Sequence, residues 1–275
     1  MMQHQVLPMP LPTEIHEEII QWAGLSQPWS TQTVVSVSAR HTRLSTLYSC
    51  ALTCRAWLPT TRTYLYHDLT FIRNDKVSLE RLVRSLEADP WLQTLIYNLN
   101  IVDDVAPGSR PFGTISNAWV HMLAYKLPHL RALGVVFPDG LAQHPRFFKS
   151  MRALGSSVMV LSLEWNCCGS FADLFRLLAV FPNLLDLTLD GTMWTPTGIR
   201  PVFPLRRFPS LCRLAIVNCH SGDNHALWRE VTYMLLQAVA NSIEVLELEE
   251  ACMPFGSSGM QSSPCTRSYT ALGSV

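Results

Sequence analysis

The sequence predicts a mixed α/β fold in which a small helical module precedes a longer array of alternating strands and helices. Apolar residues at helical spacing near the N-terminus predict the module, and a leucine frame that recurs along the rest of the chain predicts the array. The length of 275 residues also favours more than one unit. We expect a flexible N-terminus at residues 1–10, the module at 11–70, the array at 75–251 and a disordered tail at 252–275.

Three segments predict the helices of the module. In the first, Ile15, Ile19 and Trp22 lie at positions i, i+4 and i+7 after a proline suited to a helix start. The second helix is expected from residue 44 to 52 and the third from 57 to 65, followed by strand-like residues 68–72. Residues 24–43 are rich in Ser, Thr and Gln without a helical period, which predicts an inserted loop.

These segments carry a recognisable motif. Leu11-Pro12-x-Glu14-Ile15-x-x-x-Ile19, followed by Leu47-x-x-Cys50-Ala-Leu52-x-Cys54-Arg-x-Trp57, resembles the F-box motif of fungal F-box-like proteins over residues 11 to about 70. Such modules bind the helical adaptor of Skp-cullin-F-box ubiquitin ligases, so the resemblance implies this adaptor, and through it a cullin, as partners. The implied adaptor-binding residues are Leu11, Pro12, Glu14, Ile15, Ile19, Leu47, Leu52 and Trp57. The same apolar residues are also compatible with the core of a small helical bundle.

The array is predicted from a frame of the form Pro-x-Leu-x-x-Leu-x-apolar. The frame occurs at residues 90–97, 128–135, 182–189 and 209–216, and without the proline at 158–163 and 243–248. Its central leucines are Leu95, Leu133, Leu161, Leu187, Leu214 and Leu246, and most of their spacings are near the period of about 20–29 residues typical of leucine-rich repeats.

Helix-period stretches separate the frames, at residues 79–86, 119–123, 171–178 and 227–238. Each unit is therefore expected to be a strand plus a helix. A strand with alternating leucines buries one face only by stacking on its neighbours, so we expect an irregular leucine-rich-repeat solenoid.

Residues between and beside the strand leucines should share the opposite face of the sheet, because side chains alternate with a period of two. The candidate substrate-binding residues on that face are Glu164, Asp186, Asp190, Arg213, Glu247 and Glu249. They form either a solvated face or a mildly acidic surface for a basic segment of a target protein.

Composition and motifs argue against other classes of function. The 21 basic and 21 acidic residues balance, so we expect no attraction to nucleic acid or membrane. No leader-like N-terminus and no apolar run long enough to span a membrane is present, which predicts an intracellular protein of the cytoplasm or nucleus. No zinc-ligand spacing, phosphate loop, dinucleotide fingerprint or nucleophile elbow occurs, so neither metal, cofactor nor catalytic residue is expected.

The expected function is that of a non-enzymatic substrate receptor of a Skp-cullin-F-box ubiquitin ligase, with the module on the adaptor and the repeats on an unknown protein substrate. Two alternatives stay open. One is a protein-interaction scaffold whose N-terminal helices only cap the repeats, in which case Leu11 and Pro12 would be buried within the chain. The other is an enzyme built on the array, which would need a deep polar pocket with perturbed titrating groups.

Overall fold

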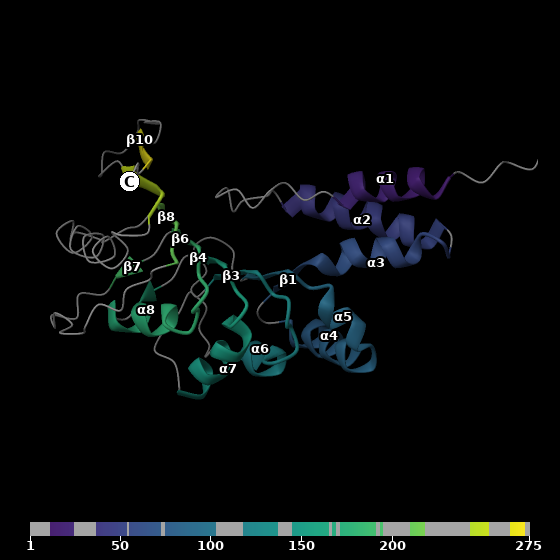
Figure 1. The fold of residues 1–275 in the computed structure, drawn as a ribbon, viewed down its shortest axis with the longest axis horizontal. Helices are drawn as coiled ribbons and strands as arrows, with labels where there is room; N and C mark the ends of the chain where they lie inside the picture. Colours follow the sequence, from purple (N-terminus) through teal and green to yellow (C-terminus); the bar gives the residue numbers. More distant parts are fainter. Residues whose placement is uncertain are drawn as a thin grey trace, which may run out of the picture. The chain divides into compact units, whose positions relative to one another are not determined.

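The protein is described by a computed structural model that covers the chain in segments (Figure 1). These segments are residues 12–24, 37–53, 55–72, 75–102, 118–136, 145–164, 167–168, 171–190, 193–194, 210–217, 243–252 and 265–272. The chain divides into two compact units, Met1–Asp68 and Leu69–Val275, close to the boundary predicted at residue 70. The mixed α/β class predicted from the sequence is confirmed.

The first unit contains three helices that contact one another: α1 (Thr13–Gly24), α2 (Val37–Thr53) and α3 (Leu58–His67). The carbonyl of Pro12 accepts hydrogen bonds from the amides of Ile15 and His16, which starts α1. Trp57 flanks the start of α3, and a proline occupies the first turn of that helix, where no amide donor is needed. The core consists of Ile20, Leu47 and Cys50, with Ala23, Trp57, Tyr64 and Leu65 packed against it.

The predicted loop 24–43 is wrong over residues 37–43, because α2 already begins at Val37, while α1 ends at Gly24 and residues 25–36 lie outside the described residues. The first turns of α2 have no apolar period, which is why the pattern of leucines placed the helix start seven residues too late. Arg43 of α2 forms an ion pair with Asp68 at the end of α3, with 2.9 Å between Nη1 and Oδ2. This pair links the first half of α2 to the end of α3.

The second unit is built on a sheet whose strands follow one another in chain order. The order is β1 (Asp68–Ile72), β2 (Asn98–Val102), β3 (Ala132–Val136), β4 (Val160–Glu164), β6 (Asp186–Asp190), β8 (Arg213–Val217), β9 (Val245–Cys252) and β10 (Cys265–Leu272). From β2 to β9 every neighbouring pair is parallel. The two-residue strands β5 (Cys167–Cys168) and β7 (Met193–Trp194) form a separate small sheet.

Columns of apolar side chains run across this sheet. Strand register aligns Leu99, Leu133, Leu161, Leu187, Leu214 and Leu246 in one row, and Ile101, Val135, Leu163, Leu189, Ile216 and Leu248 in the next. The members of both rows on β2 to β8 are at most 3% exposed. Five of the six predicted central leucines therefore occupy equivalent positions, which confirms the repeat frame for those units.

A recurring backbone contact locks the same register. One carbonyl just before each strand accepts two amide hydrogen bonds, at 2.7–3.0 Å, from the start of the next strand. The accepting residues are Tyr97, Arg131, Met159, Leu185 and Cys212. Because each repeat presents the same acceptor to the next, the strands cannot slip by one residue without losing the leucine rows.

The first predicted frame is misplaced, because Leu95 follows a short helix and Leu99 holds its position in the row. Residues Pro90–Thr94 form α5, with the carboxylate of Asp89 accepting from the amide of Trp91 at 3.2 Å. A capping aspartate followed by proline is a helix start, so this proline does not precede a strand as it does in the other frames.

The described helices of the second unit lie along one face of the sheet (Figure 1), and the burial of the leucine rows from β2 to β8 indicates that this is their side. They are α4 (Lys76–Ala88), α5, α6 (Ala118–Leu123), α7 (Pro145–Gly155) and α8 (Phe171–Leu178). Three of the four predicted helix-period stretches are confirmed, and the fourth, 227–238, lies outside the described residues. Helix α7 was missed, although Phe147, Met151 and Leu154 are buried at helical spacing.

The predicted disordered tail is wrong for residues 265–272. These residues form β10, which pairs antiparallel with β9 from Cys265 opposite Cys252 to Leu272 opposite Val245. Alternating Thr, Ser and Tyr side chains in this segment have the β-propensity that the Ser- and Gly-rich composition of the whole tail conceals.

The leucine rows predict a large effect of truncating a central member. We expect Leu187→Ala to lower the free energy of unfolding of the second unit by about 2–5 kcal/mol, because it leaves a cavity between β4 and β8. The exposed control Val77→Ala on α4 should change it by less than about 0.5 kcal/mol. Urea titration followed by circular dichroism measures both, and equal effects would contradict the proposed core.

Candidate interaction surfaces

The first unit carries a concentration of exposed apolar side chains. Of the eight large apolar residues that are exposed in the described part of the chain, five lie on α1 and α2. Ile15, Ile19 and Trp22 are 41%, 42% and 74% exposed, and Tyr48 and Leu52 are 59% and 86% exposed. Within each helix they are spaced by three or four residues, so they form one apolar stripe per helix beside the residues that face the core.

The residues predicted to bind an adaptor divide between this surface and the core. Pro12, Glu14, Ile15, Ile19 and Leu52 are exposed and available for contact. Leu47 is fully buried with Ile20, so it supports the surface from below. Trp57 is half-buried, and its ring lies 5.1 Å from that of His16. Leu11 lies outside the described residues.

Trp22 and Tyr48 belong to the exposed stripes but were not predicted as contact residues. The sequence does contain a signal for them, because Trp22 continues the Ile15 and Ile19 spacing and Tyr48 precedes Leu52 by four residues. What it does not reveal is which of two adjacent helix faces meets the core. Packing decides that by burying Ile20 instead of Ile19 and Leu47 instead of Tyr48.

Gly24 fixes how closely α1 approaches α3. A Cβ atom at this buried position would lie 2.5 Å from two ring carbons of Tyr64 and 2.9 Å from its Cβ. The absence of a side chain therefore allows the close packing that orients the exposed face of α1.

The second unit has a polar cluster on the face opposite the leucine rows. Arg213 on β8 lies between Asp186 on β6 and Glu247 on β9. Its Nη1 donates to Oδ2 of Asp186 at 3.3 Å, and its Nη2 donates to both oxygens of Glu247 at 3.1 and 3.0 Å. The structure thus brings together three of the six predicted substrate-binding residues.

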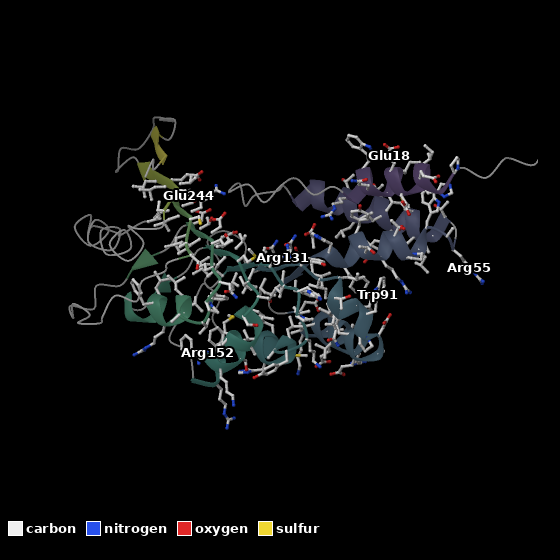
Figure 2. The ribbon with its side chains drawn as sticks, viewed as in Figure 1. Glu18, Arg55, Trp91, Arg131, Arg152 and Glu244 are labelled. Carbon is white, nitrogen blue, oxygen red and sulfur yellow. The ribbon has the colours of Figure 1, made fainter. Side chains whose placement is uncertain are left out.

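Figure 2 labels Arg131 and Glu244, the residues directly before β3 and β9.

The other three candidates lie further along the same face. Glu164 on β4 is directly opposite Asp190 on β6, and both are half-buried. Glu249 is opposite Val217, and its side chain is outside the described residues. All five predicted carboxylate residues are thus on the same face of the sheet as Arg213. Four of them are on β6 and β9, the two strands that flank β8, and Glu164 is on β4.

Partial burial shifts the pKa values of Asp186 and Arg213. Desolvation raises the pKa of Asp186 above its ordinary value of 3.8, outweighing the charge of Arg213 and its hydrogen bond, which lower it. Burial by itself lowers the pKa of Arg213, but the hydrogen bond to Glu247 and the charge of Asp186 leave it above the ordinary value. The guanidinium therefore stays charged between two carboxylates.

Two buried oxygens near this cluster have no hydrogen-bond partner among the described residues. They are Oδ1 of Asp186 and Oγ of Ser162. Ser162 lies opposite Thr188, two residues beyond Asp186, so it is on the same face of the adjacent strand. Ser162 is only 6% exposed.

The described part of the chain shows neither a metal site nor a membrane span. No group of three histidine, cysteine or acidic side chains gathers there as metal ligands would. None of the helices described is long and apolar enough to cross a membrane. A scan against protein-family models found no match to this sequence, and a search of curated proteins found no significant similarity.

Gly24→Ala tests the packing that orients α1. The added methyl group must displace the Tyr64 ring, so we expect the free energy of unfolding of the first unit to fall by about 1–3 kcal/mol. Glu18→Ala, on the exposed side of α1, is the control and should stay within about 0.5 kcal/mol of the parent. Thermal and urea unfolding measure both variants, and an unchanged Gly24→Ala protein would refute the close approach.

Asp186 provides a prediction about protonation. Carboxyl ¹³C NMR titration should give a pKa above 3.8, and Arg213→Gln should raise it further by removing a nearby positive charge and a hydrogen bond. Since the folded chain then holds this proton more tightly than the unfolded chain, the contribution of Asp186 to the free energy of unfolding falls as the pH rises from about 3.8 through the folded pKa. A pKa at or below 3.8 would contradict the desolvation.

Proposed function

We propose that this protein is a non-enzymatic substrate receptor of a Skp-cullin-F-box ubiquitin ligase, with the helical unit bound to the adaptor and the second unit bound to a target. The observation that carries the proposal is the exposed apolar surface of α1 and α2. It includes Ile15, Ile19 and Leu52, which match positions of the F-box-like motif.

The energetics of these side chains favour a bound partner. Burying one Ile or Leu side chain contributes about 1.5–3 kcal/mol, and several such residues remain exposed within one small unit. A unit of this size also buries a smaller fraction of its surface than a larger domain does. Docking the stripes of α1 and α2 against the helices of an adaptor would remove apolar area from water and stabilise the unit at the same time.

The second unit suits target binding. Its parallel strands follow chain order with helices on one face, an arrangement typical of repeat arrays such as leucine-rich repeats. The opposite face carries the charged residues Asp186, Arg213 and Glu247. A rigid sheet that presents side chains from successive repeats is well suited to holding another protein.

The mechanism would be proximity. The adaptor links the chain to a cullin, which brings the charged ubiquitin carrier near a target held by the repeats. Tethering both partners raises the effective concentration of target lysines near the carrier. No residue of this chain needs to act as a nucleophile, and such a role implies an intracellular location in the cytoplasm or nucleus.

The alternative is a protein-interaction scaffold that meets no ligase, with the N-terminal helices serving only as a cap. A cap would bury the leading residues of the motif within the chain. Within the helical unit, Pro12 and Ile15 are exposed, as docking on an adaptor requires.

The proposal predicts a specific loss of adaptor binding. Isothermal titration calorimetry of the full chain with a purified fungal Skp-type adaptor should show binding, and Ile15→Ala/Leu52→Ala should weaken it by about tenfold or more. Both residues are exposed, so the helices should stay folded by circular dichroism. A Leu11→Ala/Pro12→Ala variant tests the leading residues of the motif in the same way.

Two residues labelled in Figure 2, Glu18 and Trp91, provide matched control substitutions. Glu18→Ala removes an exposed polar side chain from α1, and Trp91→Ala removes an exposed aromatic side chain from the second unit. Both should bind the adaptor like the parent. If the folded parent chain does not bind the adaptor at all, the receptor proposal fails and the scaffold alternative takes its place.

A further inference from the structure

Two cysteines occupy paired positions where β9 ends and β10 begins. In the antiparallel register of these strands, Cys252 on β9 lies directly opposite Cys265 on β10. Directly opposed residues of antiparallel strands have Cα atoms about 4.5 or 5.5 Å apart, depending on whether the pair exchanges backbone hydrogen bonds. Both values lie within the Cα separations of about 4.4–6.8 Å found for disulfides. The backbone therefore holds the two residues at a separation that a disulfide can span.

The sequences of both strands favour this register. On the face that the cysteines share, Leu248 lies opposite Tyr269 and Glu250 lies opposite Arg267. Apolar residues thus pair with apolar ones and an acid with a base, which are favourable cross-strand combinations. A slip by one residue would move every β10 side chain to the other face and end the pairing of the two cysteines.

Paired positions distinguish these cysteines from the others that the structure describes. Cys167 and Cys168 on β5 lie opposite a methionine and a tryptophan on β7. Cys50 is buried in the core of the first unit, and Cys212 is half-buried just before β8. Within the described ranges, no second pair of cysteines is directly opposed on neighbouring strands.

We propose that Cys252 and Cys265 form a reversible disulfide by exchange with a small-molecule disulfide, oxidised glutathione. The thiolate of one cysteine attacks the glutathione disulfide and releases one reduced glutathione. The thiolate of the other cysteine then attacks the protein sulfur of the mixed disulfide and releases the second. The two cysteines supply both electrons, and their two thiol protons end on the two glutathione molecules. This modification site does not depend on the proposed role in ubiquitin transfer.

The disulfide would clamp the edge of the sheet. Strand β10 is the last of the eight-stranded sheet, with β9 as its neighbour (Figure 1). The bond would close a ring over residues 252–265 and so restrict the conformations open to β10 when it leaves β9. An edge strand held in this way separates less often from the sheet. Pairing of β10 would therefore respond to the thiol redox state of its surroundings.

The experiment uses the full chain in glutathione buffers of different oxidised-to-reduced ratio. Free thiols are then blocked with iodoacetamide, and the chain is digested with trypsin without reduction. The tryptic peptide 230–267 contains Cys252 and Cys265 and no other cysteine. In oxidised buffer mass spectrometry should find this peptide unalkylated and lighter by two hydrogen atoms, and excess reduced glutathione should restore two alkylated cysteines. A folded chain whose peptide stays doubly alkylated, or carries glutathione on both cysteines, overturns the proposal.

Variants and unfolding locate the cause of the reaction. Cys252→Ser and Cys265→Ser should each stop at the mixed disulfide with glutathione, while the matched control Cys212→Ser should oxidise like the parent. At the same glutathione ratio, urea-unfolded chain should contain at least about tenfold less ring disulfide relative to the dithiol, because only the folded register holds the cysteines together. Equal amounts in folded and unfolded chain would refute the role of the register.

Hydrogen exchange tests the clamp in the parent chain, so it requires no substitution. Amides of β10 should exchange at least about tenfold more slowly in the oxidised than in the reduced protein. Amides of β6, Asp186–Asp190, are the internal reference and should not change. Cys252→Ser/Cys265→Ser should exchange like the reduced parent in both buffers. Equal exchange of β10 in the oxidised and reduced parent would refute the clamp.

Discussion

The second unit depends on one repeated contact, in which a single carbonyl before each strand receives two amides from the next strand. This contact fixes the register, and the register puts Leu133, Leu161, Leu187 and Leu214 in one continuous buried row. Each strand then has an apolar face toward the helices and a polar face away from them. The meeting of Asp186, Arg213 and Glu247 is a consequence of that register, because residues far apart in the chain share a side only while the leucines stay aligned.

Much of this array was predictable because its signal is periodic. The frames around Leu133, Leu161, Leu187, Leu214 and Leu246 repeat with nearly constant spacing, and a leucine in each must be buried in the same way. The frame at Leu95 failed because Asp89 and Pro90 form a helix cap, and local capping outweighs resemblance to the other frames. The strand at 265–272 was missed because no apolar alternation distinguishes it from a solvated tail.

The candidate surfaces were predictable to different degrees. Alternation along a strand has only two outcomes, so the shared face of Asp186, Arg213 and Glu247 followed from the leucines. A helix offers a continuum of directions, and neighbouring apolar residues such as Ile19 and Ile20 differ by only about 100°. Three-dimensional packing decides between them, which is why Leu47 proved to be buried while Tyr48 is exposed. The start of α2 at Val37 precedes its apolar period, and Arg43 in its second turn pairs with Asp68, a contact that periodicity cannot register.

The antiparallel strand β10 gives the array a direction. Every strand from β2 to β9 points the same way, and helices α6, α7 and α8 lie in the crossovers from β2 to β6, so a unit added among these strands can follow the same path. Reversal of the chain after β9 removes that possibility, since a further unit would meet a neighbour running in the opposite sense. The hairpin therefore ends the run of parallel strands at this edge, and a duplicated strand-helix unit would have parallel neighbours on both sides only at positions before β9.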